Sequence, residues 1–368
     1  MNARNIAQRV ATVTLLAITL SGCASGQKET RRFFWPQLPE RPRIEWLAAY
    51  SSQLDFPKVG MRKFMSAIAG DEDPIRFDKP VGIKSDGNGK IYISDAGIPA
   101  VLVYDMVNDE VHLFGREMAP ALFKWPICTE LDNAGNIYVA DAEQNVISVF
   151  TPDEKPLRSI DLKGIVIKVG NFAIDKDGRL ILVDTRGHKL VILSPEGKLI
   201  KTIGERGDTD GTFNFPVAVT VNHKGEIIVG DAMNARIQIF DHDGKFLRKF
   251  GTRGDGPSDF QLIKGVAVDS DDDIYVTEGK GNKIIIFNTN GEWLLTVGGQ
   301  YSALTSGRVA PGGFLLPEGI DIDKNDRIFV VDQLNKRFQE FQYISDSFLK
   351  QHPIEGYTGS EGGGTVTP

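Results

Sequence analysis

The chain has 368 residues, of which 41% are hydrophobic and 25% are charged, and its formal net charge at pH 7 is −7. This balance is that of an ordinary globular protein. The acidic charge disfavours a nucleic-acid partner, because nucleic-acid-binding domains are usually basic.

Residues 1–22 have the features of an export signal. Arg4 and Arg9 accompany a short apolar run, Val10–Leu20, which is too short to span a bilayer but suits the centre of a signal peptide. The run ends in Leu20-Ser21-Gly22-Cys23, which resembles the lipobox of bacterial lipoproteins. This resemblance implies cleavage before Cys23, a diacylglycerol on its thiol and an acyl chain on its new amino group. The alternative is an ordinary secretory signal with an incidental cysteine.

Residues 23–43 are predicted to form a lipidated tether. Ala24 follows the cysteine, and by resemblance to Gram-negative lipoproteins this favours an exported protein held in the outer membrane, facing the periplasm or the surface. Within the tether, Phe33-Phe34-Trp35 either contacts lipid or docks on the domain. Cys128 is the only other thiol, so a lipidated Cys23 leaves no disulfide, and Cys128 is interpreted as a small buried residue.

Two segments precede the repeats inside the predicted domain, residues 44–352. Ile44–Tyr50 reads as a strand similar to the last strand of a repeat. Lys58–Ala69 places its apolar residues on one helical face, which predicts a short N-terminal helix that packs on the domain or contacts a partner or a membrane.

A sixteen-residue pattern then occurs six times. Each copy has an apolar strand, a turn that begins at Asp or Asn, a second strand and a closing acid. The closing acids are Asp95, Asp141, Asp184, Asp231, Glu278 and Asp332. They are 43 to 54 residues apart, and two further apolar strands follow in most periods. Four antiparallel strands per period predict an all-β, six-bladed β-propeller.

The closing acids and the chain ends each have a structural interpretation. An acid that terminates a strand accepts N–H groups from a loop, and it recurs because the turn recurs. The last blade takes its fourth strand either from Ile44–Tyr50, which we favour because it closes the ring, or from Ser347–His352. Residues 353–368 are predicted to be a disordered tail.

Three motifs in the repeats resemble the NHL repeat. They are Gly204-Glu205-Arg206-Gly207 followed by Phe213, Gly251-Thr252-Arg253-Gly254 followed by Phe260, and the turn from Asp231 through Asn234 to Arg236. The resemblance covers residues 77–341, and the whole chain is similar to bacterial NHL-type propeller lipoproteins. It implies a fold of the NHL/TolB-like kind, but little about function, because propellers host many activities.

The alternative function is that of a metal-dependent (Ca or Zn) lactonase- or lyase-like hydrolase that uses the axial funnel. It is suggested by two enzyme families whose folds are related to this one. Zinc-dependent amidating lyases need convergent histidines, and His112, His223 and His242 fall in turns or an outer strand. Gluconolactonase-like propellers hold a divalent cation through oxygen ligands. The matching axial candidates are Glu130, Asn171, Glu318 and Asp321. Lys264 occupies the slot equivalent to Glu318, so an ion pair is an equal alternative.

The loops on one propeller face provide the main functional hypothesis. Arginine is favoured at interfaces because its planar group pairs bidentately. The predicted partner-binding residues are Arg206, Arg253, Arg236, Arg186, Lys283 and Arg337. We therefore expect a membrane-anchored, non-enzymatic binding or scaffold module for a protein or glycan of the cell envelope. Apart from the lipid on Cys23, the sequence predicts no cofactor.

Overall fold

A computed structural model describes residues 31–56, 73–115 and 122–357. The chain divides into two compact units, Met1–Arg32 and Phe33–Pro368, and all the strands belong to the second. The predicted signal peptide, Cys23 and the predicted helix Lys58–Ala69 lie outside the described residues. Among the described residues, no helix is long and apolar enough to cross a membrane.

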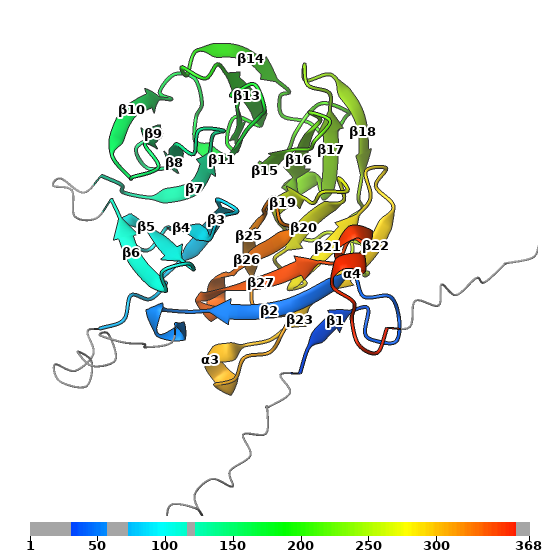
Figure 1. The fold of residues 1–368 in the computed structure, drawn as a ribbon. Coiled ribbons are helices and arrows are strands. Elements are labelled where there is room, and N and C mark those ends of the chain that lie inside the picture. Colours follow the sequence, from blue (N-terminus) through cyan, green and yellow to red (C-terminus); the bar gives the residue numbers. More distant parts are fainter. Residues whose placement is uncertain (1–30, 57–72, 116–121, 358–368) are drawn as a thin grey trace, which may run out of the picture. The chain divides into compact units, whose positions relative to one another are not determined.

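Six antiparallel sheets form the six blades of a β-propeller, which confirms the predicted fold (Figure 1). Blade 1 consists of β3 (Pro80–Ser85), β4 (Lys90–Asp95), β5 (Ala100–Asp105) and β6 (Glu110–Phe114). Blade 2 consists of β7 (Pro126–Leu131), β8 (Ile137–Asp141), β9 (Val146–Phe150) and β10 (Pro156–Asp161). Blade 3 consists of β11 (Val169–Ile174), β12 (Leu180–Asp184), β13 (Lys189–Leu193) and β14 (Leu199–Ile203). Blade 4 consists of β15 (Pro216–Val221), β16 (Ile227–Asp231), β17 (Arg236–Phe240) and β18 (Phe246–Phe250). Blade 5 consists of β19 (Ile263–Val268), β20 (Ile274–Glu278), β21 (Lys283–Phe287) and β22 (Trp293–Val297).

Blade 6 combines both ends of the chain. In order from the axis outward it contains β25 (Pro317–Ile322), β26 (Arg327–Asp332), β27 (Arg337–Tyr343), β2 (Ile44–Tyr50) and β1 (Phe33–Trp35). The pairing of β2 with β27 confirms the N-terminal strand as the one that closes the ring. The rival segment, Ser347–His352, instead falls mostly within α4 (Asp346–Gln351).

The tether docks on the blade from Phe33 onward. β1 pairs with β2 in antiparallel register, and Phe34 is buried against Ile344 and Ile354. Phe33–Trp35 therefore belongs to the folded unit, and so does Ile354 from the segment expected to be a tail. Docking of Phe33–Trp35 is one of the two predicted alternatives, whereas the burial of Ile354 differs from the predicted tail. Phe34 and Ile354 complete an apolar cluster with Ile344 at the outer edge of blade 6.

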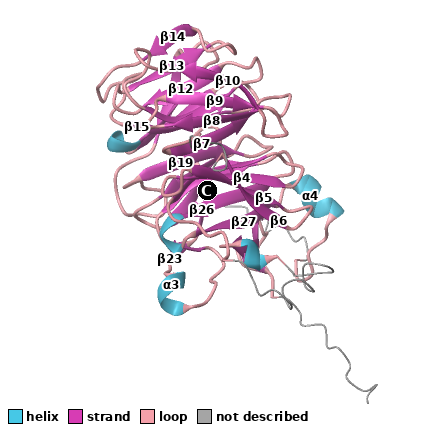
Figure 2. Cartoon of the chain, turned by 90° about the vertical axis from the view of Figure 1, so that its left-hand side faces the viewer, coloured by secondary structure: helices cyan, strands magenta, loops and turns pink. Residues whose placement is uncertain are grey.

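Within the described residues, helical segments are few and short, as Figure 2 shows. They are η1 (Gln53–Asp55), η2 (Ala232–Asn234), η3 (Gln333–Asn335), α3 (Ala303–Ser306) and α4. A two-stranded pair, β23 (Gly299–Gln300) and β24 (Gly313–Phe314), flanks α3 in the long loop that leads into blade 6.

The Gly-to-Phe motifs build the loops between blades. Phe213 and Phe260 are fully buried, and each ring lies directly over the glycine that opens its loop. A Cβ atom on Gly204 or on Gly251 would stand 2.5 Å from a ring carbon of that phenylalanine, and both glycines have positive φ. Only glycine meets both demands, so the motif recurs for a packing reason.

The closing acids accept loop N–H groups, as the sequence predicted. Asp95 accepts the N–H groups of Asp78 and Lys79, both at 2.8 Å, and Asp184 accepts those of Ile167 and Lys168 at 2.8 and 3.1 Å. All six acids are buried. Each fixes the loop that precedes the first strand of its own blade, and so it positions the face on which the binding residues were predicted.

Candidate functional site: the axial channel and the loop face

The first strands of the six blades line a channel along the propeller axis. Each first strand contacts the first strands of both neighbouring blades. The channel has a volume of about 340 Å³, and all four predicted axial residues line it: Glu130, Asn171, Glu318 and Asp321. All four lie on first strands, at the second, third or fifth position, and the first strands line the axis.

One layer of the channel holds Lys84 between two carboxylates. Its Nζ lies 3.0 Å from Glu130 Oε2 and 3.0 Å from Asp321 Oδ1. Burial would lower the pKa of Lys84, but the two carboxylates outweigh burial and raise it. Burial raises the pKa of Glu130 to about 7, although Lys84 opposes that rise. A second hollow of about 360 Å³, on the side of the hairpin turns, shares Lys84 and Asp321 with the channel.

A second layer lies nearer the loop face. Lys264 Nζ lies 2.7 Å from Glu318 Oε1. Burial raises the pKa of Glu318, and the ammonium groups of Lys264 and, more weakly, Lys79 oppose this. The ion pair that the sequence offered as an alternative to a metal is thus present.

Asn171 and Cys128 tie neighbouring first strands together. Asn171 accepts the N–H of Val219 at 2.9 Å and donates from Nδ2 to Cys128 Sγ at 3.3 Å. Cys128 is buried, as predicted, and burial raises the pKa of its thiol. A thiol held protonated is a poor nucleophile.

These axial residues do not fit a divalent cation. Asp321 uses one carboxylate oxygen for Lys84 and the other for the N–H of Ser85, at 2.8 Å. A lysine ammonium also accompanies Glu130 and Glu318, and Asn171 is committed to the backbone. Hard cations need about six oxygen ligands, whereas here ammonium groups stand where a cation would be placed. We therefore derive no chemical step through a metal at the axis.

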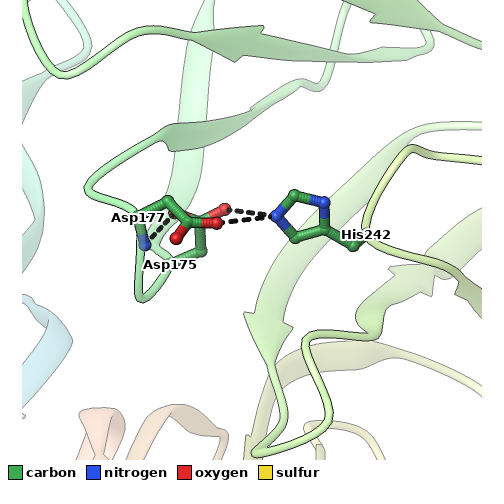
Figure 3. A group of neighbouring side chains, drawn as sticks. All are labelled: Asp175, Asp177 and His242. Atoms are coloured by element: carbon green, nitrogen blue, oxygen red, sulfur yellow. Dashed lines mark hydrogen bonds and ion pairs between the residues drawn. The ribbon is translucent and has the colours of Figure 1, made fainter.

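One His and two Asp side chains do meet elsewhere, between the turns of blades 3 and 4 (Figure 3). His242 Nε2 lies 2.9 Å from Asp177 Oδ2 and 3.9 Å from Asp175 Oδ2. Arg179 Nε donates to that same Asp175 oxygen at 2.7 Å, and Arg179 Nη2 donates to the carbonyl of His242 at 2.9 Å. A guanidinium already neutralises the buried carboxylate, so this group ties two blades together.

The other histidines have structural contacts. His188 Nδ1 accepts the N–H of Phe215 at 3.1 Å. His112 and His223 pair with Glu154 and Asp272, both at 2.8 Å, and His352 Nδ1 lies 3.3 Å from Phe348 O. No histidine lines the axial channel. This arrangement gives the zinc-lyase alternative no set of convergent imidazoles within the part of the chain that the structure describes.

The predicted arginines separate into exposed and buried sets. Arg186, Arg206 and Arg253 are exposed on the loop face. Arg236 and Arg337, by contrast, are only 6% and 3% exposed. Neither is available to a partner, so the prediction that they bind one is wrong. Lys283 is half-buried and donates to the carbonyl oxygens of two loop residues, at 2.6 and 3.2 Å.

The buried arginines are part of the scaffold. Arg236 Nε donates to the closing acid Asp231 at 2.8 Å, and its other nitrogens donate to three backbone carbonyls of the preceding loop. Arg337 makes the equivalent bond to Asp332 at 2.7 Å. Each arginine stands five residues after its closing acid, and this shared spacing was the signal of a structural role.

Two apolar residues that the sequence analysis did not select join the exposed arginines. Phe215 is 40% exposed and Met233 is 53% exposed. Met233 donates its N–H to Asn214 O at 3.0 Å, and Arg253 Nη2 donates to Met233 O at 2.6 Å. Because Arg206 precedes Phe213 in the same loop, these contacts place the exposed residues of blades 4 and 5 together.

Comparisons with known proteins support the fold. A family model, DUF5128, described as a 6-bladed beta-propeller, matches residues 217–306, which is less than half of the chain. No curated protein matches the chain. A structure of a protein of unknown function from Bacteroides thetaiotaomicron is similar, with 15% identity, a TM-score of 0.60, and coverage of 82% of this chain and 75% of that one.

Two further structures have names that indicate enzymes. A streptogramin B lyase is 13% identical with a TM-score of 0.52, covering 73% of this chain and 95% of its own. A putative gluconolactonase is 12% identical with a TM-score of 0.54, covering 73% of this chain and 89% of its own. At such identities the likeness concerns the fold alone, and fold does not imply function.

Proposed function

We propose that the chain is an exported, lipid-anchored protein whose propeller binds a protein partner in the cell envelope without catalysing a reaction. One observation carries the proposal: exposed Phe215 and Met233 lie among exposed arginines on one face of a rigid ring. We call Arg186, Arg206, Phe215, Met233 and Arg253 the blade-4 patch. Aromatic residues, methionine and arginine are the types enriched in protein interfaces.

The backbone around Phe215 presents its ring outward. Phe215 has a φ of 52°, which a bulky residue rarely adopts. The His188 imidazole accepts its N–H, and the two rings lie 4.5 Å apart, edge to face. A fixed aromatic side chain loses little conformational entropy on binding, so this arrangement favours Phe215 as an anchor for a partner.

The axial channel supports binding over hydrolysis. Its three carboxylates accompany lysines, at distances of 2.7 to 3.0 Å. A general acid or base needs a group free to exchange a proton with the substrate, and ion-paired carboxylates are poor candidates. The metal-dependent alternative loses its ligand set for the same reason.

The lipid anchor is the second part of the proposal. Cys23 at the end of the apolar run is the predicted attachment site, and two or three acyl chains anchor a protein stably. The segment after Cys23 leads into β1, so the anchor would join the propeller at the outer edge of blade 6. We propose the outer membrane as the location, on the grounds of the residue that follows Cys23.

Site-specific cross-linking in intact cells tests the binding face. A photoreactive residue at Met233 is expected to give one discrete protein adduct, and Arg206→Ala should weaken that adduct. The matched control is the same photoreactive residue at Leu199, which is 55% exposed but lies on an outer strand of blade 3. Equal adducts at both positions, no adduct at Met233, or a protease-resistant glycan adduct would each contradict the proposal.

A further inference from the structure

Six residues surround the loop-side mouth of the axial channel. Each immediately precedes the first strand of its blade, and those strands line the channel. They are Lys79, Trp125, Lys168, Phe215, Leu262 and Leu316. At these six positions, blades 1 to 3 contribute two lysines and an indole, and blades 4 to 6 contribute apolar residues, next to the ion pair of Lys264 and Glu318.

The Trp125 indole makes cation–π contacts with both lysines of this mouth. Lys168 Nζ lies 4.4 Å from the centroid of the indole ring, and Lys79 Nζ lies 5.9 Å from it. A cation–π contact attracts an ammonium group without neutralising its charge. Each lysine also has three N–H donors, which a ring face leaves available for a ligand.

Two other lysines of the loop face are paired with acids. Lys124 lies 3.6 Å from Glu143, and Lys336 lies 3.1 Å from Asp78. No described carboxylate lies within ion-pair distance of Lys79 or Lys168, although Lys79 is near enough to Glu318 to lower the pKa of that carboxyl. In a chain of net charge −7, this mouth is a local concentration of positive charge. Such a site attracts anions to a cleft.

The channel beneath the mouth has the size of a small-ligand pocket. Its volume of about 340 Å³ falls within the usual range of roughly 300–1,000 Å³. Near the mouth, blades 1 to 4 contribute Val81, Ile127, Gly170 and Val217 to its wall. Lys264 and Glu318 in blades 5 and 6 pair with each other, so the apolar contacts of this part of the wall come from blades 1 to 4.

We propose that this mouth binds a small organic anion, with its carboxylate or phosphate group against Lys79 and Lys168 and its apolar body along Val81, Ile127 and Val217. The mouth shares Phe215 with the blade-4 patch, but the residues proposed to contact the anion lie outside that patch, and the inference does not depend on the proposed protein partner. In ligand pockets a few polar groups set the orientation of the ligand, and Lys79 and Lys168 would have this role here.

Calorimetry on the full-length protein in detergent at low salt tests this site. The probes are 2-naphthoate, 2-naphthyl phosphate and the neutral 2-naphthamide. One anion is expected to bind with a stoichiometry of one and at least tenfold more tightly than the amide. The tighter of the two anions identifies the head group.

Matched variants locate the site. Lys168→Gln and Lys79→Gln should each weaken anion binding about tenfold, because each removes one charge–charge contact. Lys163→Gln, which changes an exposed lysine of the same loop, should leave binding unchanged, and Val217→Phe should abolish it by filling the channel. Equal binding of the amide, an absence of saturable binding, or an equal effect of Lys163→Gln and Lys168→Gln would overturn the proposal. Unchanged melting temperatures confirm that the variants fold.

Discussion

Arg236 and Arg337 tie the loops of blades 4 and 6 to the blade interior. The guanidinium of Arg236 bonds a buried carboxylate and three backbone carbonyls, which is the planar, multidentate recognition that lysine cannot copy. Removal of one partner from a buried ion pair leaves an uncompensated charge, and this typically costs about 3–5 kcal/mol. Arg236 is therefore a residue of stability and not of partner capture.

Arg236→Ala is expected to lower the free energy of unfolding by about 3–5 kcal/mol, because Asp231 loses its counter-charge. Arg206→Ala, which changes an exposed arginine of the adjacent loop, should change it by less than about 0.5 kcal/mol. Urea denaturation of the two variants checks this pair. Equal losses of stability would refute the assignment.

Asp269 gives the propeller a pH-dependent stability. Burial and the charge of Asp273 raise its pKa to about 7, although the Tyr275 hydroxyl, which donates to it at 2.9 Å, opposes that rise. In the unfolded chain the carboxyl titrates near 3.8. Between these values the folded state holds a proton that the unfolded state releases, so stability falls as pH rises from about 4 to 7.

Asp269→Asn should remove this part of the pH dependence. The wild type is expected to lose on the order of 2–4 kcal/mol between pH 4 and pH 8 relative to the variant. Asparagine can keep the turn, because Asn222 accepts the two equivalent N–H groups in blade 4. Denaturation curves across this pH range give the slopes, with Asp132→Asn in the equivalent turn of blade 2 as the control. Parallel slopes for the wild type and Asp269→Asn would contradict the prediction.

At the scale of the elements, glycine at the third position of a first strand sets the distance between blades 6, 1 and 2. At Gly319 a Cβ atom would stand 2.6 Å from Val81 O, and at Gly82 it would stand 2.6 Å from Ile127 O. Both clashes involve backbone atoms, which cannot rotate away. Glycine here lets the first strands of blades 6, 1 and 2 approach closely around the channel.

Gly319→Ala is therefore expected to destabilise the protein by about 1–3 kcal/mol, as other overpacked sites do. The control is Gly299→Ala, since a Cβ atom there would meet nothing within 4 Å. Thermal melting followed by circular dichroism compares the two variants. An unchanged melting temperature for Gly319→Ala would mean that the blades can separate without cost.

The scale of the whole molecule explains what the sequence could predict. Turns, closing acids and strand alternation are local, so the six repeats predicted the blades and placed Glu130 and Asp321 at the axis. Pairing across blades depends on ring closure: Lys84 and Asp321 are 237 residues apart in sequence and meet only because blade 6 lies beside blade 1. Trp125 likewise meets lysines from two neighbouring blades. Such contacts follow from the closed ring and from no single repeat.

Ring closure itself rests on the N-terminal strand. β2 covers β27, all of whose residues are buried, and Tyr50 stacks on Phe338 with 4.9 Å between ring centroids. Without β2, the backbone N–H and C=O groups of β27 would form an open sheet edge, which invites pairing between molecules. Closure by the two chain ends thus protects the fold from association.

Two truncated variants test this dependence. A chain that begins at Phe33 keeps β1 and β2 and is expected to melt like the wild type and to elute as a single species. A chain that begins at Ser51 lacks both strands, and we expect it to lose its cooperative melting transition and to aggregate, because it exposes Phe338 and Phe341 together with the edge of β27. Size-exclusion chromatography and thermal melting distinguish the two. A folded, non-aggregating variant that begins at Ser51 would show that the remaining strands of blade 6 suffice to close the ring.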